Sequence, residues 1–198
     1  MVRAALTGGI ATGKSFCLGA FAALGAATLD ADILAREAVA AQSPGLAQVV
    51  RRFGPQVLRP DGSLDRGALG RIVFADRGAR ADLEAIIHPE VYRRIQDWSA
   101  NLPGGIRVAI ADIPLLFETG QEHLFDTVIV CACGPAEQIR RIMARDGLSE
   151  PEARDRLNAQ WPIEEKVARA NYVIRTDGSV EETREQVRRV YESLKSEV

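Results

Sequence analysis

Residues 8–15 read Gly-Gly-Ile-Ala-Thr-Gly-Lys-Ser and fit the pattern G-x-x-x-x-G-K-[ST]. They follow the apolar run at residues 2–6 and lead into a helix-like stretch at residues 14–24. Glycines let such a backbone curl so that its N–H groups point at phosphate oxygens, and the following helix N-terminus adds its dipole. A glycine-rich turn with a lysine by chance is the plain alternative. The setting favours a loop for a nucleoside triphosphate, with Lys14 on the β- and γ-phosphates and Ser15 on Mg²⁺.

The size and charge of the chain limit what else it can be. It has 198 residues and a formal net charge of −2. That length suits one α/β core with a modest insertion. A mildly acidic chain is a poor candidate for wrapping nucleic acid, which needs a concentrated basic surface. No stretch approaches the roughly 20 apolar residues of a membrane span, and the first strand leaves no room for a signal peptide. We expect a cytoplasmic protein without a nucleic-acid or membrane partner.

The three cysteines are Cys17, Cys131 and Cys133. An odd number without a disulfide framework fits a reducing compartment, and there is no second pair to complete a metal site. We interpret them as small core residues, with a redox or metal role as the alternative.

The hydrophobic pattern predicts an α/β fold with a five-stranded parallel sheet. A strand, a helix and a second strand open the chain, as in a right-handed βαβ unit. The strands are short and rich in apolar or β-branched residues, which is typical of strands buried on both faces, so helices should cover the sheet in three layers. They are expected at residues 2–6, 26–29, 107–111, 127–133 and 172–174.

Residues 31–103 form a mostly helical excursion between the second and third strands. The excursion is too long for a simple crossover, which makes it a candidate acceptor-binding region. Ser43 and Asp65 are expected to cap helices within it. His88 precedes Pro89, which should kink or break the last helix of this region.

Residues 138–169 are rich in arginine and predict a pair of charged helices. Gly147 supplies a turn, and the run from Ser149 to Glu152 fits a capping box that starts the second helix. A solvated hairpin held by ion pairs is one interpretation. A lid is the other, because phosphoryl transfer needs excluded water and neutralised phosphate charge.

Carboxylates follow two of the predicted strands, where parallel α/β sheets bind their ligands. Asp30 and Asp32 follow the second strand, and Asp32 and Arg36 share a helix face. They suit proton acceptance or acceptor binding, or else a helix cap and a surface ion pair. Asp112 follows the third strand, as a magnesium-holding carboxylate does. The next segment, residues 114–118, would either clasp an acceptor or pack in the core.

With these pieces in order, the chain resembles the dephospho-CoA kinase family over nearly its whole length. The motifs that carry the resemblance are the loop with its preceding Leu6-Thr7, Asp30-Ala31-Asp32 with Ala35-Arg36, His88-Pro89, the run from Asp112 to Glu118, Gln138 with Arg141 and Arg145, and Arg156 with Gln160.

The resemblance implies a P-loop kinase fold in one domain, residues 1–198. Its core would be residues 1–30, 104–137 and 170–198, its helical acceptor-binding insertion residues 31–103, and its helical lid residues 138–169. It implies transfer of the γ-phosphoryl group of ATP to the ribose 3′-hydroxyl of dephospho-CoA, with Mg²⁺ as cofactor. We expect a monomer or weak homo-oligomer.

The resemblance and the loop together imply a set of site residues. Asp32 matches the general base and acts with Lys14 in catalysis. Acceptor binding falls to Asp30, Arg36, His88 and Leu116, and the metal to Ser15 and Asp112. The nucleotide-binding residues are Ala11, Thr12, Gly13, Lys14, Ser15, Phe16, Arg141 and Arg145.

The chain departs in places from the family pattern, in which the loop commonly reads Gly-Ser-Gly-Lys-Ser-Thr, whereas Ala11-Thr12 precede Gly13 here. Ala11 stands where glycine would more easily adopt the backbone conformation, and Phe16 replaces the threonine. Near the last strand, Asp177-Gly178 keeps the turn chemistry of the usual Asn-x-Gly but loses an asparagine contact.

Two rival functions also fit the phosphate-binding loop. Another small-molecule kinase on the same scaffold, such as a nucleoside monophosphate or shikimate kinase, would carry different acceptor motifs. A nucleotide-sensing module that transfers no phosphate would have no need of Asp32 as a base.

Overall fold

The computed structural model describes residues 1–197 and divides into two compact units. The core unit is the chain up to Leu29 together with the chain from Leu102 onward, and the helical unit is Asp30–Asn101.

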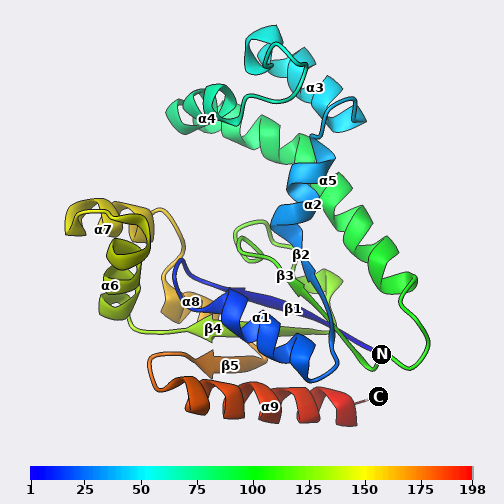
Figure 1. Ribbon diagram of the computed structural model, residues 1–198, viewed down its shortest axis with the longest axis vertical. Helices are drawn as coiled ribbons and strands as arrows, with labels where there is room; N and C mark the ends of the chain where they lie inside the picture. Colours follow the sequence, from blue (N-terminus) through cyan, green and yellow to red (C-terminus); the bar gives the residue numbers. More distant parts are fainter. Residues whose placement is uncertain (198) are drawn as a thin grey trace. The chain divides into compact units, whose positions relative to one another are not determined.

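The core unit is built on a five-stranded sheet with strand order β2-β3-β1-β4-β5 (Figure 1). Strand β1 pairs in parallel with β3 and β4, and β4 pairs in parallel with β5. The predicted α/β fold with a five-stranded parallel sheet is confirmed. The strands are β1 (Val2–Gly8), β2 (Ala27–Asp30), β3 (Val108–Asp112), β4 (Thr127–Ala132) and β5 (Tyr172–Arg175).

Helices cover this sheet because its central strands have no face suited to water. Every residue of β3 and β4 is buried, so successive side chains are buried on opposite faces. Helices α1 (Lys14–Ala23) and α9 (Val180–Ser196) place Phe21 and Val187 in one apolar cluster with Leu6, Ile110 and Ile129. Figure 1 shows α9 running alongside β5. All three cysteines are free and buried, as expected of core residues.

The arginine-rich segment forms the predicted helical hairpin. It consists of α6 (Pro135–Asp146) and α7 (Glu150–Asn158), and the short helix α8 (Ile163–Val167) follows. Gly147 ends α6 with a φ of 67°, and Ser149 and Glu152 form the expected capping box. Ile139, Ile142 and Ala153 share a small apolar cluster with Ile10 and Ala11, so the hairpin packs against the phosphate-binding loop. A 3₁₀ turn, η2 (Glu122–Leu124), precedes β4.

The helical unit has its own apolar cluster, which includes Val49, Phe53 and Leu69. Ser43 caps α3 by accepting the Leu46 N–H, and Asp65 caps α4 by accepting the Ala68 N–H. Both predicted caps are confirmed. The elements are α2 (Ala31–Ala38), α3 (Pro44–Phe53), η1 (Pro55–Val57), α4 (Arg66–Ala75) and α5 (Arg77–Ala100).

Helix α5 corrects one part of the expectation for Pro89, because the proline does not break the helix, which continues from Arg77 to Ala100. Proline has no backbone N–H, so the helical hydrogen bond that would reach the Ala85 carbonyl cannot form. Val91 and Ile95 are buried just beyond the proline, and α5 packs against α2, α3 and α4. Packing on neighbouring helices therefore outweighs the local preference of proline to end a helix.

Candidate active site

The phosphate-binding loop joins β1 to α1 and faces a cavity. Residues Gly8 to Ser15 line this cavity of about 420 Å³ together with Pro114, Arg141, Arg145 and Gln160. Two loop residues have positive φ, Ala11 at 59° and Gly13 at 80°. The expectation that Ala11 would need a glycine-like backbone conformation is confirmed.

Lys14 and Asp112 lie side by side at the carboxyl ends of β1 and β3. The Lys14 Nζ is 3.2 Å from the Asp112 Oδ1, and Asp112 is only 5% exposed. The register that pairs Leu6 with Asp112 delivers this carboxylate beside the loop. A hydroxyl at Ser15 and a carboxylate at Asp112 are hard oxygen donors, which fit Mg²⁺ because that ion takes one or two protein oxygens and fills its shell with phosphate and water.

Arg141 is fixed against the loop from three sides. Its Nε donates to Glu137 Oε1 at 2.7 Å, and its Nη1 donates to the Ala11 carbonyl at 3.3 Å and to Thr176 Oγ1 at 3.1 Å. Hydrogen bonds from Arg140 and then Arg141 lower the pKa of Glu137 to about 2. Glu137 therefore stays ionised at neutral pH and keeps Arg141 in place.

Arg145 also lines the cavity, although its guanidinium is bonded to Asp146 at 2.8 Å and 3.0 Å. Asp146 also accepts a bond from Arg156 at 2.7 Å. Phe16 is 38% exposed, and the guanidinium of Arg184 lies 5.7 Å from the centre of its ring. The phenyl ring of Phe16 thus lies against Arg184 of α9. If Phe16 binds the nucleotide, its backbone rather than its ring makes the contact.

Two neighbouring leucines in the segment after β3 differ in their exposure to solvent. Leu116 is completely buried, whereas Leu115 is 39% exposed. The side chain of Leu116 packs in the core, which was the alternative for this segment, and it offers no accessible surface to an acceptor. Leu115 is the exposed apolar side chain here.

The carboxylates of the helical unit lie at the start of α2. The Asp30 Oδ1 accepts the N–H of Asp32 at 2.8 Å, so Asp30 is the helix cap that one interpretation expected. Asp32 is exposed in the first turn and Arg36 is exposed in the last. The carboxylate of Asp32 therefore lies on the surface of this unit.

His88 lies in the middle of α5 and is half-buried. Its ring makes an edge contact with Tyr92 at a centroid distance of 6.4 Å. Burial lowers its pKa, and the charge of Glu84 opposes that shift only in part. The imidazole is therefore neutral at neutral pH and can donate one hydrogen bond and accept another.

Sequence reasoning missed the roles of four polar residues in the core unit. Lys166 is fully buried, and its Nζ lies 2.6 Å from Glu118 Oε1. Gln138, Gln160 and Thr176 bond to the backbone of the loop. The two glutamines stood in the motifs that carried the family resemblance, but nothing in the spacing showed what they contact.

A loop of this kind between the first strand and helix, with a carboxylate delivered by the neighbouring strand, makes the core unit that of a P-loop kinase. The family model described as dephospho-CoA kinase matches residues 2–182. The chain belongs to the dephospho-CoA kinase family and is an ATP-dependent phosphotransferase.

Individual relatives agree with this assignment. The dephospho-CoA kinase of Anaeromyxobacter dehalogenans is 51% identical over 177 residues, which cover 89% of this chain and 84% of the relative. That of Cutibacterium acnes is 48% identical over 197 residues, covering 98% and 85%. The solved dephospho-CoA kinase from Campylobacter jejuni superposes with a TM-score of 0.74 at 29% identity and covers 98% of both chains. Across residues 1–197, no helix combines the length and apolar character needed to cross a bilayer.

Proposed function

We propose that this enzyme transfers the γ-phosphoryl group of ATP to the 3′-hydroxyl of the ribose of dephospho-CoA. The products are coenzyme A and ADP, and Mg²⁺ is the cofactor. The observation that carries the proposal is the cavity in which the loop, Lys14 and Arg141 meet, in a chain whose relatives are dephospho-CoA kinases. We further propose that it works in the cytoplasm as a monomer or weak homo-oligomer.

The core unit supplies the donor half of the reaction. Loop N–H groups and Lys14 bind the phosphates of ATP, while Arg141 and Arg145 stabilise the charge on the transferring group. Ser15 and Asp112 would hold Mg²⁺, which would neutralise negative charge on the phosphates of ATP when bound. The 3.2 Å between Lys14 Nζ and Asp112 Oδ1 places the proposed phosphate-binding ammonium beside the proposed metal-holding carboxylate.

The helical unit supplies the acceptor half. Asp32 accepts or orients the proton of the attacking hydroxyl, which raises the nucleophilicity of that oxygen. Asp30 fixes the first turn of α2 through the Asp32 N–H and so limits where this carboxylate can point. Arg36 and neutral His88 bind the acceptor, the first by charge and the second by hydrogen bonding.

The test of this proposal measures ADP release from ATP with Mg²⁺ and three acceptors: dephospho-CoA, AMP and shikimate. We expect turnover with dephospho-CoA to exceed that with either alternative by at least about 10³-fold, because the others lack most of its binding groups. Equal rates with AMP or shikimate would refute the proposed acceptor. Binding of ATP without turnover on any of the three would favour a nucleotide-sensing module.

A further inference from the structure

The backbone of the phosphate-binding loop is held from outside by side chains of the later part of the chain. A loop that turns N–H groups inward toward phosphates turns carbonyl groups outward, and these need donors of their own. Three consecutive carbonyls are satisfied in this way. The Ile10 oxygen accepts from Gln138 Nε2 at 2.7 Å, the Ala11 oxygen from Arg141 Nη1 at 3.3 Å and the Thr12 oxygen from Thr176 Oγ1 at 2.9 Å.

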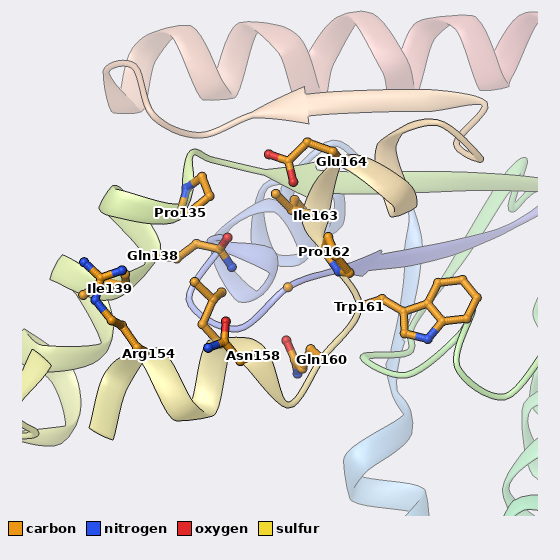
Figure 2. A pocket seen from close by; sticks show the side chains of 12 residues that line it. Pro135, Gln138, Ile139, Arg154, Asn158, Gln160, Trp161, Pro162, Ile163 and Glu164 are labelled. Atoms are coloured by element: carbon orange, nitrogen blue, oxygen red, sulfur yellow. The ribbon is translucent and has the colours of Figure 1, made fainter. Parts of the chain in front are cut away.

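Ile10 is held on both sides of its α-carbon. Its N–H donates to Gln160 Oε1 at 2.7 Å, while its carbonyl accepts the bond from Gln138. Gln138 comes from α6 and is fully buried, whereas Gln160 follows α7. Figure 2 shows both side chains extending toward the loop from these separate segments. We call Gln138 and Gln160 the glutamine clamp.

Gly9 makes room for this clamp. A Cβ at position 9 would lie 2.6 Å from Gln138 Nε2, too close for any real contact. The backbone φ of Gly9 is not positive, so its lack of a side chain serves the approach of the amide rather than an unusual conformation. The loop and the clamp are therefore shaped to one another.

Ala11, which follows the clamped residue Ile10, has a strained backbone. Ala11 has a φ of 59°, a conformation in which a Cβ is unfavourable. Such a conformation persists only when its surroundings determine it. A second cavity of about 360 Å³ is lined by Gly9, Gln138 and Gln160, among others (Figure 2). The loop therefore has space beside it into which it can relax when the clamp is removed.

We propose that Gln138 and Gln160 are positioning residues of the kinase reaction. By holding both peptide groups of Ile10, they keep Ala11 in its strained conformation and the loop in the shape that receives ATP. Neither glutamine needs to touch the reacting atoms. The inference rests on the proposed role of the loop as the ATP site.

The first experiment removes each amide while keeping the length of the side chain. Gln160→Met and Gln138→Met are expected to raise the KM for ATP about tenfold, because the competent loop shape is less populated. The kcat should stay within about threefold, since the loop regains its shape once ATP is bound. Gln186→Met is the matched control. Gln186 also bonds both peptide groups of one residue, Arg175, at 2.8 Å each, but lies outside the ATP cavity.

The second experiment adds Ala11→Gly to the Gln160→Met variant. Glycine adopts a positive φ without strain, so the loop should keep its shape at position 11 even when Gln160 no longer holds it. The KM for ATP should therefore return to within about threefold of the wild-type value. Urea titration must show that Gln160→Met is fully folded under the assay conditions, so that the rescue of the KM reports the shape of the loop and not the general stabilisation that Ala11→Gly also brings. Gln160 is partly exposed, so its variant is expected to fold even where Gln138→Met does not.

A third measurement separates the clamp from the proposed function. Hydrogen exchange at amides 11–14 in the nucleotide-free protein should accelerate about tenfold in Gln160→Met and not in Gln186→Met. If the wild-type protein bound no ATP but exchange still accelerated in Gln160→Met, the proposed function would be overturned and the clamp upheld. An unchanged KM and unchanged exchange in folded Gln160→Met, or no rescue by Ala11→Gly, would overturn the clamp.

Discussion

At the scale of single residues, the phosphate-binding loop has positive φ angles at two positions, and only one of these two positions is a glycine. Ala11 has a φ of 59° and Gly13 a φ of 80°. Ala11→Gly should raise the free energy of unfolding of the core unit by about 0.5–1 kcal/mol, and Gly13→Ala should lower it by about 1–2 kcal/mol. Urea titrations followed by Trp161 fluorescence in a Trp98→Phe background would measure both. Destabilisation by Ala11→Gly would show that the surroundings favour the methyl group.

Asp32 is the proposed proton acceptor, and Asn has a side chain of the same size and shape. Asp32→Asn should lower kcat by about 10²-fold or more, with a smaller change in the KM for ATP, because the amide cannot accept the hydroxyl proton. Initial rates at saturating ATP and dephospho-CoA measure this, and circular dichroism checks the fold. An unchanged kcat in the folded variant would reduce Asp32 to a structural residue.

His88 makes the stability of the helical unit depend on pH. Burial lowers its folded-state pKa below the ordinary value of 6.5, so the unfolded chain binds a proton more readily. Stability is therefore fully present above about pH 6.5 and is lost as the pH falls through the folded-state pKa. Urea titrations of the wild type between pH 5 and pH 8 should show this loss, and His88→Gln should reduce it. His123→Gln, in the core unit, is the control. If both variants reduced the loss of stability at low pH equally, His88 would not be the group responsible for it.

At the scale of elements, the short helix α8 is tied to the segment after β3 by a buried ion pair. Lys166 is fully buried against Glu118, whose side chain is 17% exposed. Lys166→Met should lower the free energy of unfolding by about 3–5 kcal/mol, because it leaves a buried carboxylate without its partner. Adding Glu118→Leu should restore most of that loss.

The exposed pair of Arg154 and Glu150 on α7 provides the comparison for this measurement. Their side chains are 59% and 54% exposed, so Arg154→Met should change stability by less than about 1 kcal/mol. Urea denaturation of all three variants decides the point. Equal effects of Lys166→Met and Arg154→Met would mean that water reaches the buried pair.

The elements also show which features of this fold are readable from sequence. The caps at Ser43 and Asp65 and the capping box at Ser149 were predictable because each depends on residues within three positions of one another. The continuity of α5 through Pro89 was not, because packing on other helices decides it. The pairing of Lys166 with Glu118 was not either, since burial and partner are set by the tertiary fold.

The site divides in the same way. The positions of Lys14 and Ser15 at the start of α1 and of Asp112 at the end of β3 could be predicted, because strand and turn geometry fix such positions locally. The roles of these residues stay predictions. Leu116 was expected to bind the acceptor, but it is buried and Leu115 is the exposed leucine, since which of the two faces the core depends on how the chain turns after β3. The glutamine clamp depends on the direction of loop carbonyls, which no sequence pattern specifies.

At the scale of the whole molecule, each of the two units has an apolar cluster of its own. The proposed donor residues lie in the core unit, and the proposed acceptor residues Asp30, Asp32, Arg36 and His88 lie in the helical unit. A ligand stabilises the part of a protein that must be folded to bind it, by about 2.7 kcal/mol at a concentration 100 times its Kd. Each substrate should therefore protect a different part of the chain from exchange.

Hydrogen exchange with each substrate alone tests this division of labour. ATP with Mg²⁺ should slow exchange in the loop and in α6, and leave α2 and α5 largely unchanged. Dephospho-CoA should slow exchange in α2 and in the part of α5 around His88, because ordering at a binding site lowers the population of locally open states. Arg36→Ala removes a cationic side chain, so it should weaken the protection that dephospho-CoA gives to α2 and α5. It should leave the protection of the loop and α6 by ATP unchanged. If ATP alone protected α2 and α5 as strongly as the loop, the donor and acceptor sites would not be divided between the units as proposed.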